Sequence, residues 1–235
     1  MLLSDKDLRE LAVKHELVTP FLEQNCEGAT IDLTLDSQIK KQKSNINHII
    51  VNRVSDSDYE VFDINKEDFI LEPNESVLVQ SIEYFKIPNN MAGIIFERYS
   101  IKLKGLVVSP ASYMNPGYEG RLSFLLTNNS NGTIQLVSGV KFCQLSIASL
   151  SSESEFPYRK QDAKYMGSED VQLSKLHLDQ EIQNYFRDSG VRELSGDEAS
   201  QMGLNLMDNI KSNAKKYAEI IKENLGDNNG ESSAT

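Results

Sequence analysis

The stretch SPASYMNPGYEGRLSFLLTN, residues 109–128, joins a stiff loop directly to an apolar segment. Pro110 and Pro116 fix the backbone angle φ, whereas Gly117 and Gly120 allow a positive φ or the close approach of another group. The residues RLSFLLT that follow are mostly apolar and predict a β-strand. A loop whose shape is set in advance, next to a strand, is a candidate functional site.

Short strand-like runs lie on both sides of this stretch. They are β-branched or alternate between apolar and polar residues: ATIDLTL, HIIVNRV, YEVFDI, SVLVQSI, AGIIFE, GLVVS, RLSFLLT, GTIQLV and FCQLSIASL. Clusters of Asn, Asp, Gly, Pro and Ser separate them. Many short strands at close spacing are typical of an all-β sandwich or barrel-like domain, which we expect over residues 1–150.

Other segments are expected to flank these strands. Ser4 and Asp7 form a capping-box-like start, and the apolar spacing that follows predicts a helix over residues 5–15. Residues 151–178 are polar and aromatic without a sustained period, which is typical of an extended arm. Residues 179–225 predict a helical extension, and residues 226–235 a disordered tail.

The helical extension contains two candidate helices. The first has Asp179 as a possible N-cap and Gly190 as a possible stop. The second has apolar residues at steps of 3, 4, 3 and 4, namely Met207, Ile210, Ala214, Tyr217 and Ile221. This spacing fits one amphipathic helix packed on the body, and it also fits a coiled-coil seam of about two heptads.

Composition narrows the class of protein. The formal net charge of −11 argues against a nucleic-acid polymer or an anionic membrane as the partner, because both bind through summed basic charge. Cys26, Cys143 and three scattered histidines offer neither a zinc set nor a disulfide framework. The acidic start MLLSDKDLREL does not resemble a signal peptide, and no run approaches the ~18 apolar residues of a membrane span. We therefore expect a soluble, cytoplasmic protein.

Four segments, in this order, resemble one known family. They are LLSDKDLREL with GATIDLTL, then ILEPNESVLVQSIEYFKIPNNMAGIIFERYS, then YMNPGYEG, and finally FPYRKQDAKYMG. The second resembles the stretch that ends in a Gly-Arg-Ser-Ser phosphate loop, the third an I-D-P-G-x-x-G loop, and the fourth a D-A-K-Y arm. Residues 1–178 thus resemble the trimeric dCTP deaminases and their dUTPase relatives.

The resemblance implies a mainly β subunit, a distorted β-barrel or jelly-roll of the dUTPase-like (β-clip) type. It further implies a homotrimer with nucleotide sites between neighbouring chains and an arm that closes over a deoxynucleoside triphosphate. Mg²⁺ would arrive with the triphosphate, without zinc. In the stiff loop, Ala111, Asn115, Gly117 and Tyr118 would hold the deoxyribose and base, and Gly117 would let the backbone approach closely.

Phosphate binding is assigned to Arg98, Ser100 and Lys102 in ERYSIKLKG. A guanidinium fork and a hydroxyl donor near a turn suit phosphate oxygens. From the pattern alone, an ordinary exposed basic strand face is the alternative, and the resemblance favours the phosphate role for Arg98 and Ser100. Tyr99 replaces the first serine of the family loop and removes a small donor.

In the arm, Lys164, Tyr165 and Lys175 match positions that reach the nucleotide in the family. Further lysine and arginine side chains make the arm basic in an otherwise acidic chain, which favours a phosphate lid over a solvated linker. Ser168 stands where the family usually has glutamine.

The catalytic positions depart from the family pattern. The glutamate that serves deamination as acid and base matches Leu125, and the arginine that helps to orient water falls at or beside Leu103. In the dUTPases an aspartate polarises water, and its position here is Asn115, which can hydrogen-bond the sugar but cannot act as a carboxylate base. Glu97 and Glu119 are other acids nearby.

Three functions remain open from the sequence. The first is a dCTP deaminase, with or without dUTPase activity, that acts on dCTP to give dUTP. The second is a nucleotide-binding or regulatory trimer without turnover, because losing a general acid/base costs ~10²–10⁴ in rate. The third is a structural subunit whose helical extension recruits a partner.

Overall fold

The computed structural model describes residues 1–46, 54–109, 113–161, 163–188 and 207–219. Internal contacts divide the chain into two units, residues 1–179 and residues 180–235. The first unit contains the β-strands, and the described part of the second is helical.

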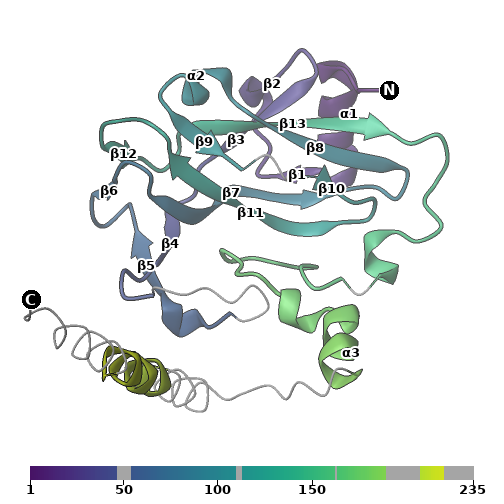
Figure 1. Cartoon of the computed structure of the whole chain (residues 1–235). Helices are drawn as coiled ribbons and strands as arrows, with labels where there is room; N and C mark the ends of the chain where they lie inside the picture. Colours follow the sequence, from purple (N-terminus) through teal and green to yellow (C-terminus); the bar gives the residue numbers. More distant parts are fainter. Residues whose placement is uncertain (47–53, 110–112, 162, 189–206, 220–235) are drawn as a thin grey trace, which may run out of the picture. The chain divides into compact units, whose positions relative to one another are not determined.

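Two antiparallel sheets form the first unit, as upper and lower layers in Figure 1. One sheet has the order β10-β8-β13-β3-β2 among the described residues. Its strands are β2 (Cys26–Glu27), β3 (Thr30–Thr34), β8 (Met91–Glu97), β10 (Tyr113–Met114) and β13 (Lys141–Ser149).

The other sheet has the order β5-β4-β7-β11-β9 over the described segments, with β1 also paired to β7. Its strands are β1 (Val18–Thr19), β4 (Gln38–Gln42), β5 (Tyr59–Asp63), β7 (Ser76–Lys86), β9 (Leu106–Val108) and β11 (Glu119–Asn128). A small separate ladder joins β6 (Phe69–Leu71) to β12 (Ile134–Leu136).

The hydrophobic core lies between the two sheets. Phe124 of β11 and Phe142 of β13 meet with ring centroids 5.2 Å apart and planes at 88°. Leu126, Leu33 and Leu145 are fully buried beside them. Because successive side chains of a strand point to opposite faces, the inward position of Phe124 and Leu126 puts the residue between them, Leu125, on the outer face of β11.

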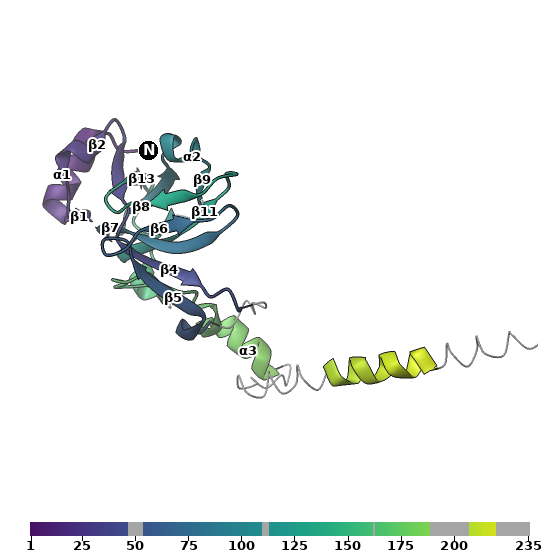
Figure 2. The ribbon, with the colours of Figure 1, turned by 90° about the vertical axis from the view of Figure 1, so that its left-hand side faces the viewer.

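Helix α1 (Asp5–His15) covers one end of the sheets, next to β2 and β3 (Figure 2). Ser4 is its N-cap and accepts a hydrogen bond from the Asp7 amide, as the sequence predicts. Leu8 and Ala12 are its buried residues. The remaining short helices of this unit are η1 (Glu23–Asn25), η2 (Asp56–Asp58), α2 (Tyr99–Lys102), η3 (Tyr158–Lys160) and η4 (Leu176–Leu178).

The second unit contains α3 (Gln180–Asp188), which starts directly after Asp179 as predicted. Residues 207–219 are also helical, and Met207, Ile210 and Tyr217 are exposed in them. Gly190 and Ile221 lie outside the described residues. In the portions of the chain with described structure, no helix is long and apolar enough to cross a membrane.

The predicted fold class, mainly β with an N-terminal helix and a C-terminal helical extension, is confirmed. The sheets form an open, distorted arrangement rather than a closed barrel. The expected strand HIIVNRV lies almost wholly outside the described residues. Strand β4, QIKKQ, was not predicted, because its only apolar residue is Ile39. The boundaries expected at residues 150, 178 and 225 stay predictions.

Candidate functional site

A cavity of about 420 Å³ lies between strand β11 and the arm, residues 151–178. We call it the arm pocket. Its walls combine leucine, aromatic and polar side chains, among them Asn115, Tyr118, Ser123, Leu125, Tyr165 and Ser168. The stiff loop, the strand that follows it and the arm therefore meet at one place.

The arm lies along the first half of β11 and is held there by hydrogen bonds of the backbone. The Arg121 amide donates to the Ser168 carbonyl (2.6 Å), and the Gly167 amide donates to the Glu119 carbonyl (2.8 Å). Farther along, the Gln172 amide donates to Ser123 Oγ (2.8 Å). These bonds fix the path of the arm over the pocket.

Gly120 permits this close approach. Its φ is +143°, and a Cβ atom there would lie 2.9 Å from the Ser168 nitrogen and 3.2 Å from the Tyr118 hydroxyl. Real Cβ atoms essentially never come within 3.0 Å of another heavy atom, so a side chain at this position would push the arm backbone at Ser168 away. The sequence-based expectation that Gly120 serves a close approach is confirmed.

Gly120→Ala is therefore expected to detach the arm from β11. The amide of Gly167, whose bond runs beside this position, should exchange its hydrogen about two- to tenfold faster, because each lost bond removes ~0.5–1.5 kcal/mol of protection. Hydrogen exchange read by mass spectrometry measures this. Gly132→Ala is the matched control, because a Cβ atom there meets nothing within 4 Å. An exchange rate that stays at the native value in Gly120→Ala would contradict the assignment.

The loop Asn115–Gly117 is a tight turn closed against the end of β7 and the arm. The Gly117 amide donates to the Ile87 carbonyl (3.0 Å), and the Tyr158 amide donates to the Pro116 carbonyl (2.7 Å). Gly117 has φ +78°, so the predicted positive φ is confirmed. Asn115 lines the arm pocket.

Tyr118 forms a rigid wall between the loop and the arm. It is 5% exposed, and its ring centroid lies 5.5 Å from that of Tyr158. Its hydroxyl donates to the Arg121 carbonyl (2.7 Å). Burial raises the pKa of Tyr118, so the hydroxyl remains a neutral donor throughout the physiological range.

Leu125, the residue that the resemblance matches to the family's glutamate, faces the arm pocket. It is 40% exposed, and its cross-strand partner is Leu78 of β7. None of the described side chains that line this pocket is a carboxylate, and Arg121 is its charged lining residue. The arm pocket around Leu125 therefore has no described side chain that could accept a proton from water as a carboxylate would.

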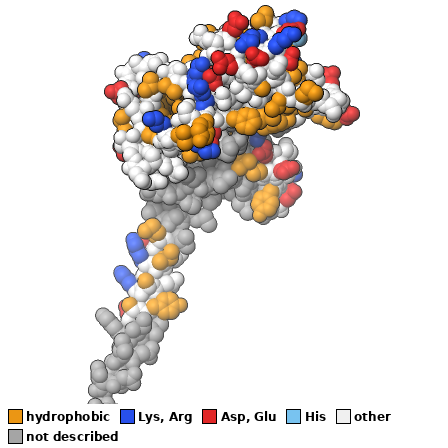
Figure 3. All heavy atoms as spheres, turned by 90° about the horizontal axis from the view of Figure 1, so that it is seen from above, with side chains coloured by type: hydrophobic (Ala, Val, Ile, Leu, Met, Phe, Trp, Pro, Cys, Tyr) orange, Lys and Arg blue, Asp and Glu red, His pale blue; other side chains and the backbone are white. Residues whose placement is uncertain are grey.

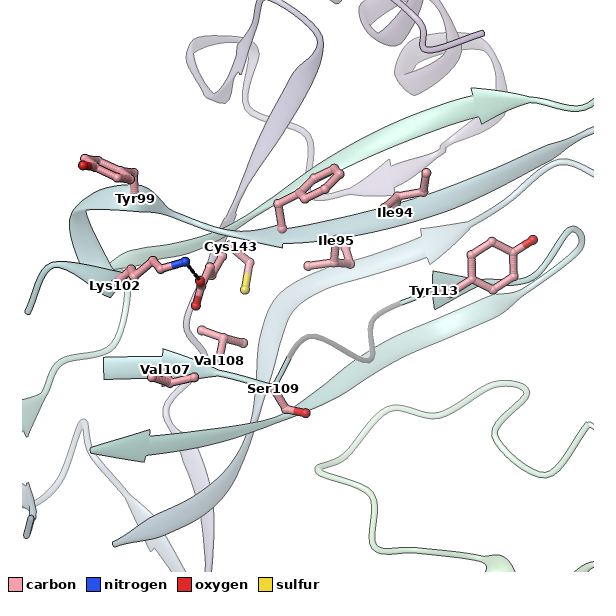
Figure 4. Close-up of a pocket in the computed structure, with 11 residues that line it drawn as sticks. Ile94, Ile95, Tyr99, Lys102, Val107, Val108, Ser109, Tyr113 and Cys143 are labelled. Atoms are coloured by element: carbon pink, nitrogen blue, oxygen red, sulfur yellow. Dashed lines mark ion pairs between the residues drawn. The ribbon is translucent and has the colours of Figure 1, made fainter. Parts of the chain in front are cut away.

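A second cavity, about 790 Å³, opens between the edges of the two sheets (Figure 4). We call it the sheet-edge pocket. Ile95 and the buried thiol of Cys143 lie deep in it, Tyr99 and Lys102 lie at one end, and Tyr113 at the other. Tyr113 also lines the arm pocket.

The three predicted phosphate-binding residues lie at or beside α2, next to the sheet-edge pocket. Arg98 precedes α2, and its Nε lies 3.3 Å from an oxygen of Asp32. Lys102 Nζ lies 2.8 Å from Glu97 Oε1, and this hydrogen bond raises the pKa of Lys102. Ser100 is exposed within α2. Both cations thus have a carboxylate partner within the same chain.

The predicted arm residues form a compact cluster. The Tyr165 hydroxyl accepts from the Lys175 amide (2.8 Å), and Lys175 Nζ lies 5.1 Å from the Tyr165 ring centroid. Lys175 Nζ also donates to the Lys164 carbonyl (2.8 Å), and the Lys164 ammonium pairs with Asp179.

One chain brings part of the predicted set to two pockets, whereas Gly117, Lys164 and Lys175 line neither of them. Asn115, Tyr118 and Tyr165 line the arm pocket, while Lys102 lines the sheet-edge pocket with Arg98 and Ser100 beside it. Ala111 lies outside the described residues.

Two residues of the pocket, Arg121 and Ser123, were not predicted from the sequence. Arg121 pairs with Asp36 (3.1 Å), and Ser123 holds the arm at Gln172. Both share a face of β11 with Leu125, so the alternation in RLSFLLT could have identified them. No sequence signal marks Gln172.

Comparisons with known proteins agree with the resemblance. A family model described as dCTP deaminase-like matches residues 2–150. A curated dCTP deaminase, dUMP-forming, from Rhodococcus erythropolis is 33% identical over 184 residues, which cover 76% of this chain and 97% of that protein. The protein of the same name from Mycobacterium marinum is 32% identical over 193 residues, covering 80% and 99%.

A solved structure is similar in fold. The crystal structure of 2′-deoxycytidine 5′-triphosphate deaminase from Agrobacterium tumefaciens matches with a TM-score of 0.50 at 17% identity. The match covers 62% of this chain and 47% of that one, so the chain spans about half of that structure. The family model covers more than half of this chain, and the two relatives cover more than two thirds of it. The chain therefore belongs to the dCTP deaminase-like family.

Proposed function

We propose that this protein binds a pyrimidine deoxynucleoside triphosphate and serves pyrimidine deoxynucleotide metabolism by the hydrolytic deamination of dCTP. The observation that carries the proposal is the meeting of the Asn115–Gly117 loop, β11 and the arm at one pocket. The curated relatives that match most of the chain are named as dCTP deaminases that form dUMP, which favours the same substrate class. dUTP is the second candidate ligand.

The arm pocket suits the base and sugar of such a ligand. Its volume of about 420 Å³ falls in the range of small-molecule sites, and rigid rings such as Tyr118 and Tyr165 offer flat apolar surfaces. The Asn115 amide, which lines the pocket, can hydrogen-bond a sugar hydroxyl. Gly117 is buried, and its missing side chain makes room for Asn89 and Pro157 of the same chain, so it shapes the turn rather than contacting the ligand. Specificity for the deoxyribose would come from this turn.

The triphosphate requires the second group of residues, Arg98, Ser100 and Lys102. Since they lie at the sheet-edge pocket of the same chain, we propose that a neighbouring chain supplies them, as in a homotrimer. Mg²⁺ enters with the triphosphate as part of the substrate.

The surface beside these residues has the composition of a subunit contact. Exposed aromatic and apolar side chains lie there, with exposed fractions of 49% for Phe96, 74% for Tyr99 and 68% for Leu103. Figure 3 shows hydrophobic side chains that gather among charged groups on one face of the molecule. Burial of such groups in a neighbour is the usual reason for their exposure in one chain.

The chemistry needs one group that takes a proton from water and returns it to ammonia. Leu125 cannot do this, and Glu97 is the carboxylate that a neighbouring chain would bring together with Arg98. The native protein is therefore expected to transfer these protons slowly, because Glu97 pairs with Lys102 (2.8 Å) and does not line the arm pocket of its own chain.

We place the reaction in the cytoplasm. Cys26 and Cys143 are free thiols and are buried, which suits a reducing compartment.

The purified full chain, supplied with Mg²⁺ and either dCTP or dUTP, tests the proposal. Ammonia should be released from dCTP, and a pyrophosphate assay reports whether the product is dUTP or dUMP. Light scattering should give the mass of a trimer. If neither product forms, the proposed reaction is wrong, and calorimetry then separates the binding trimer without turnover from a protein that binds no nucleotide.

A further inference from the structure

Lys164 is the arm lysine that the resemblance matches to a nucleotide-binding position, and it forms an ion pair within its own chain. Its ammonium pairs with the carboxylate of Asp179 in a short contact. The Lys164 side chain is only 16% exposed and that of Asp179 is 36% exposed. Because the pair is partly shielded from water, it is stronger than an ordinary surface pair.

The rest of the arm holds this pair in place. The Lys164 carbonyl accepts from Lys175 Nζ (2.8 Å), and Lys175 is fixed in turn by the ring and hydroxyl of Tyr165. Asp179 itself follows the short helix η4, where its amide donates to the Leu176 carbonyl (3.0 Å). Residues 164–179 therefore form a closed cluster in which the carboxylate cannot swing away freely.

We propose that Asp179 is an internal competitor for the nucleotide, an autoinhibitory carboxylate that occupies Lys164 until a triphosphate displaces it. The inference rests on the proposed function, because it requires that Lys164 contacts phosphate. A triphosphate carries several negative charges and one carboxylate carries a single charge, so the ligand can replace Asp179 at Lys164. Each binding event nevertheless gives up the Lys164–Asp179 pair, and the observed affinity is lower by that amount.

Asp179→Asn tests the inference by a gain of affinity, which a destabilised protein would not produce. We expect this variant to bind the non-hydrolysable imido analogues of dUTP and dCTP, with Mg²⁺, about three- to fivefold more tightly than the native chain. Isothermal titration calorimetry of the full chain at low ionic strength measures the change. Asp170→Asn is the matched control: it removes the same charge from the same arm, and Asp170 is exposed without an ion pair among the described contacts.

Lys164→Gln completes the design. It should weaken binding, and in its background Asp179→Asn should have no effect, because the competition requires the lysine. An unchanged or weaker affinity in Asp179→Asn would overturn the inference. An equal gain in Asp170→Asn would also overturn it, because the cause would then be net charge. If the native chain binds neither analogue, the proposed function itself fails, and this outcome is distinct from binding that Asp179→Asn leaves unchanged.

Discussion

Leu125→Glu is expected to raise the rate of dCTP deamination by about 10²-fold or more, because it adds a general acid/base to the arm pocket, whose described lining side chains include no carboxylate. The side chain faces the arm pocket and is 40% exposed, so a carboxylate there would reach a bound base. Its apolar surroundings, which include Leu78 and Leu122, would raise the pKa of the new carboxyl and bring it closer to neutral pH. A carboxyl of that kind can both accept and return a proton.

The assay for this variant is the release of ammonia from dCTP at saturating concentration, with the product identified by chromatography. Leu125→Gln is the control, because it has nearly the same size and polarity but does not exchange a proton in this range. A rate that stays at the native value would mean that another group already moves the protons. Glu97 of a neighbouring chain is the first candidate, and Glu97→Gln should then lower the rate.

Glu83→Leu is expected to lower the free energy of unfolding by about 2–4 kcal/mol. Glu83 lies on β7, is 3% exposed, and accepts hydrogen bonds from both the amide and the hydroxyl of Thr34. The ladder between β3 and β13 shifts its register next to Thr34, so this carboxylate satisfies an amide that the shift leaves available. Leucine would leave two partly buried donors of Thr34 without their acceptor.

Glu83→Gln is the matched control, since its amide oxygen can still accept from Thr34, and its cost should stay within about 1 kcal/mol. Denaturant unfolding at equal protein concentration measures both variants. Equal stability of the Leu and Gln variants would contradict the role of Glu83.

The difference in stability between the native chain and Glu83→Gln is expected to depend on pH. Burial raises the pKa of Glu83 above its ordinary value of 4.5, although hydrogen bonds from Thr34 oppose the shift. A raised pKa in the folded state means that Glu83 contributes stability below the ordinary value and loses it as the pH rises through the folded value. The native chain should therefore lose stability relative to Glu83→Gln as the pH rises above about 4.5 and through the raised pKa of Glu83.

Local signals made most of the fold predictable. The Ser4 cap and the apolar spacing behind it define α1, and alternation defines strands such as β7 and β11. Strand β4 was not predicted because lysine and glutamine, which make up most of it, do not favour a strand by local sequence alone. Lys41 is stabilised there by an ion pair with Glu75, a residue far away in the sequence. Only the tertiary structure supplies that partner.

The candidate site was predictable in its parts and not in their arrangement. Positive φ at Gly117 follows from the turn composition, and the loop and the arm do meet. The separation of Lys102 from Asn115 into different pockets depends on which strands pair, since β10 joins β8 and β11 joins β7. No spacing between residues 102 and 115 in the sequence contains that information.

The clasp between β11 and the arm is made largely by main-chain atoms, those of Arg121 with Ser168 and of Gly167 with Glu119. Because main-chain atoms form these bonds, most amino acid substitutions on the arm leave them intact, provided that Gly120 is kept. Side chains that line the arm pocket can therefore be exchanged one at a time while the backbone contact between β11 and the arm is kept. New preferences can therefore evolve by single substitutions.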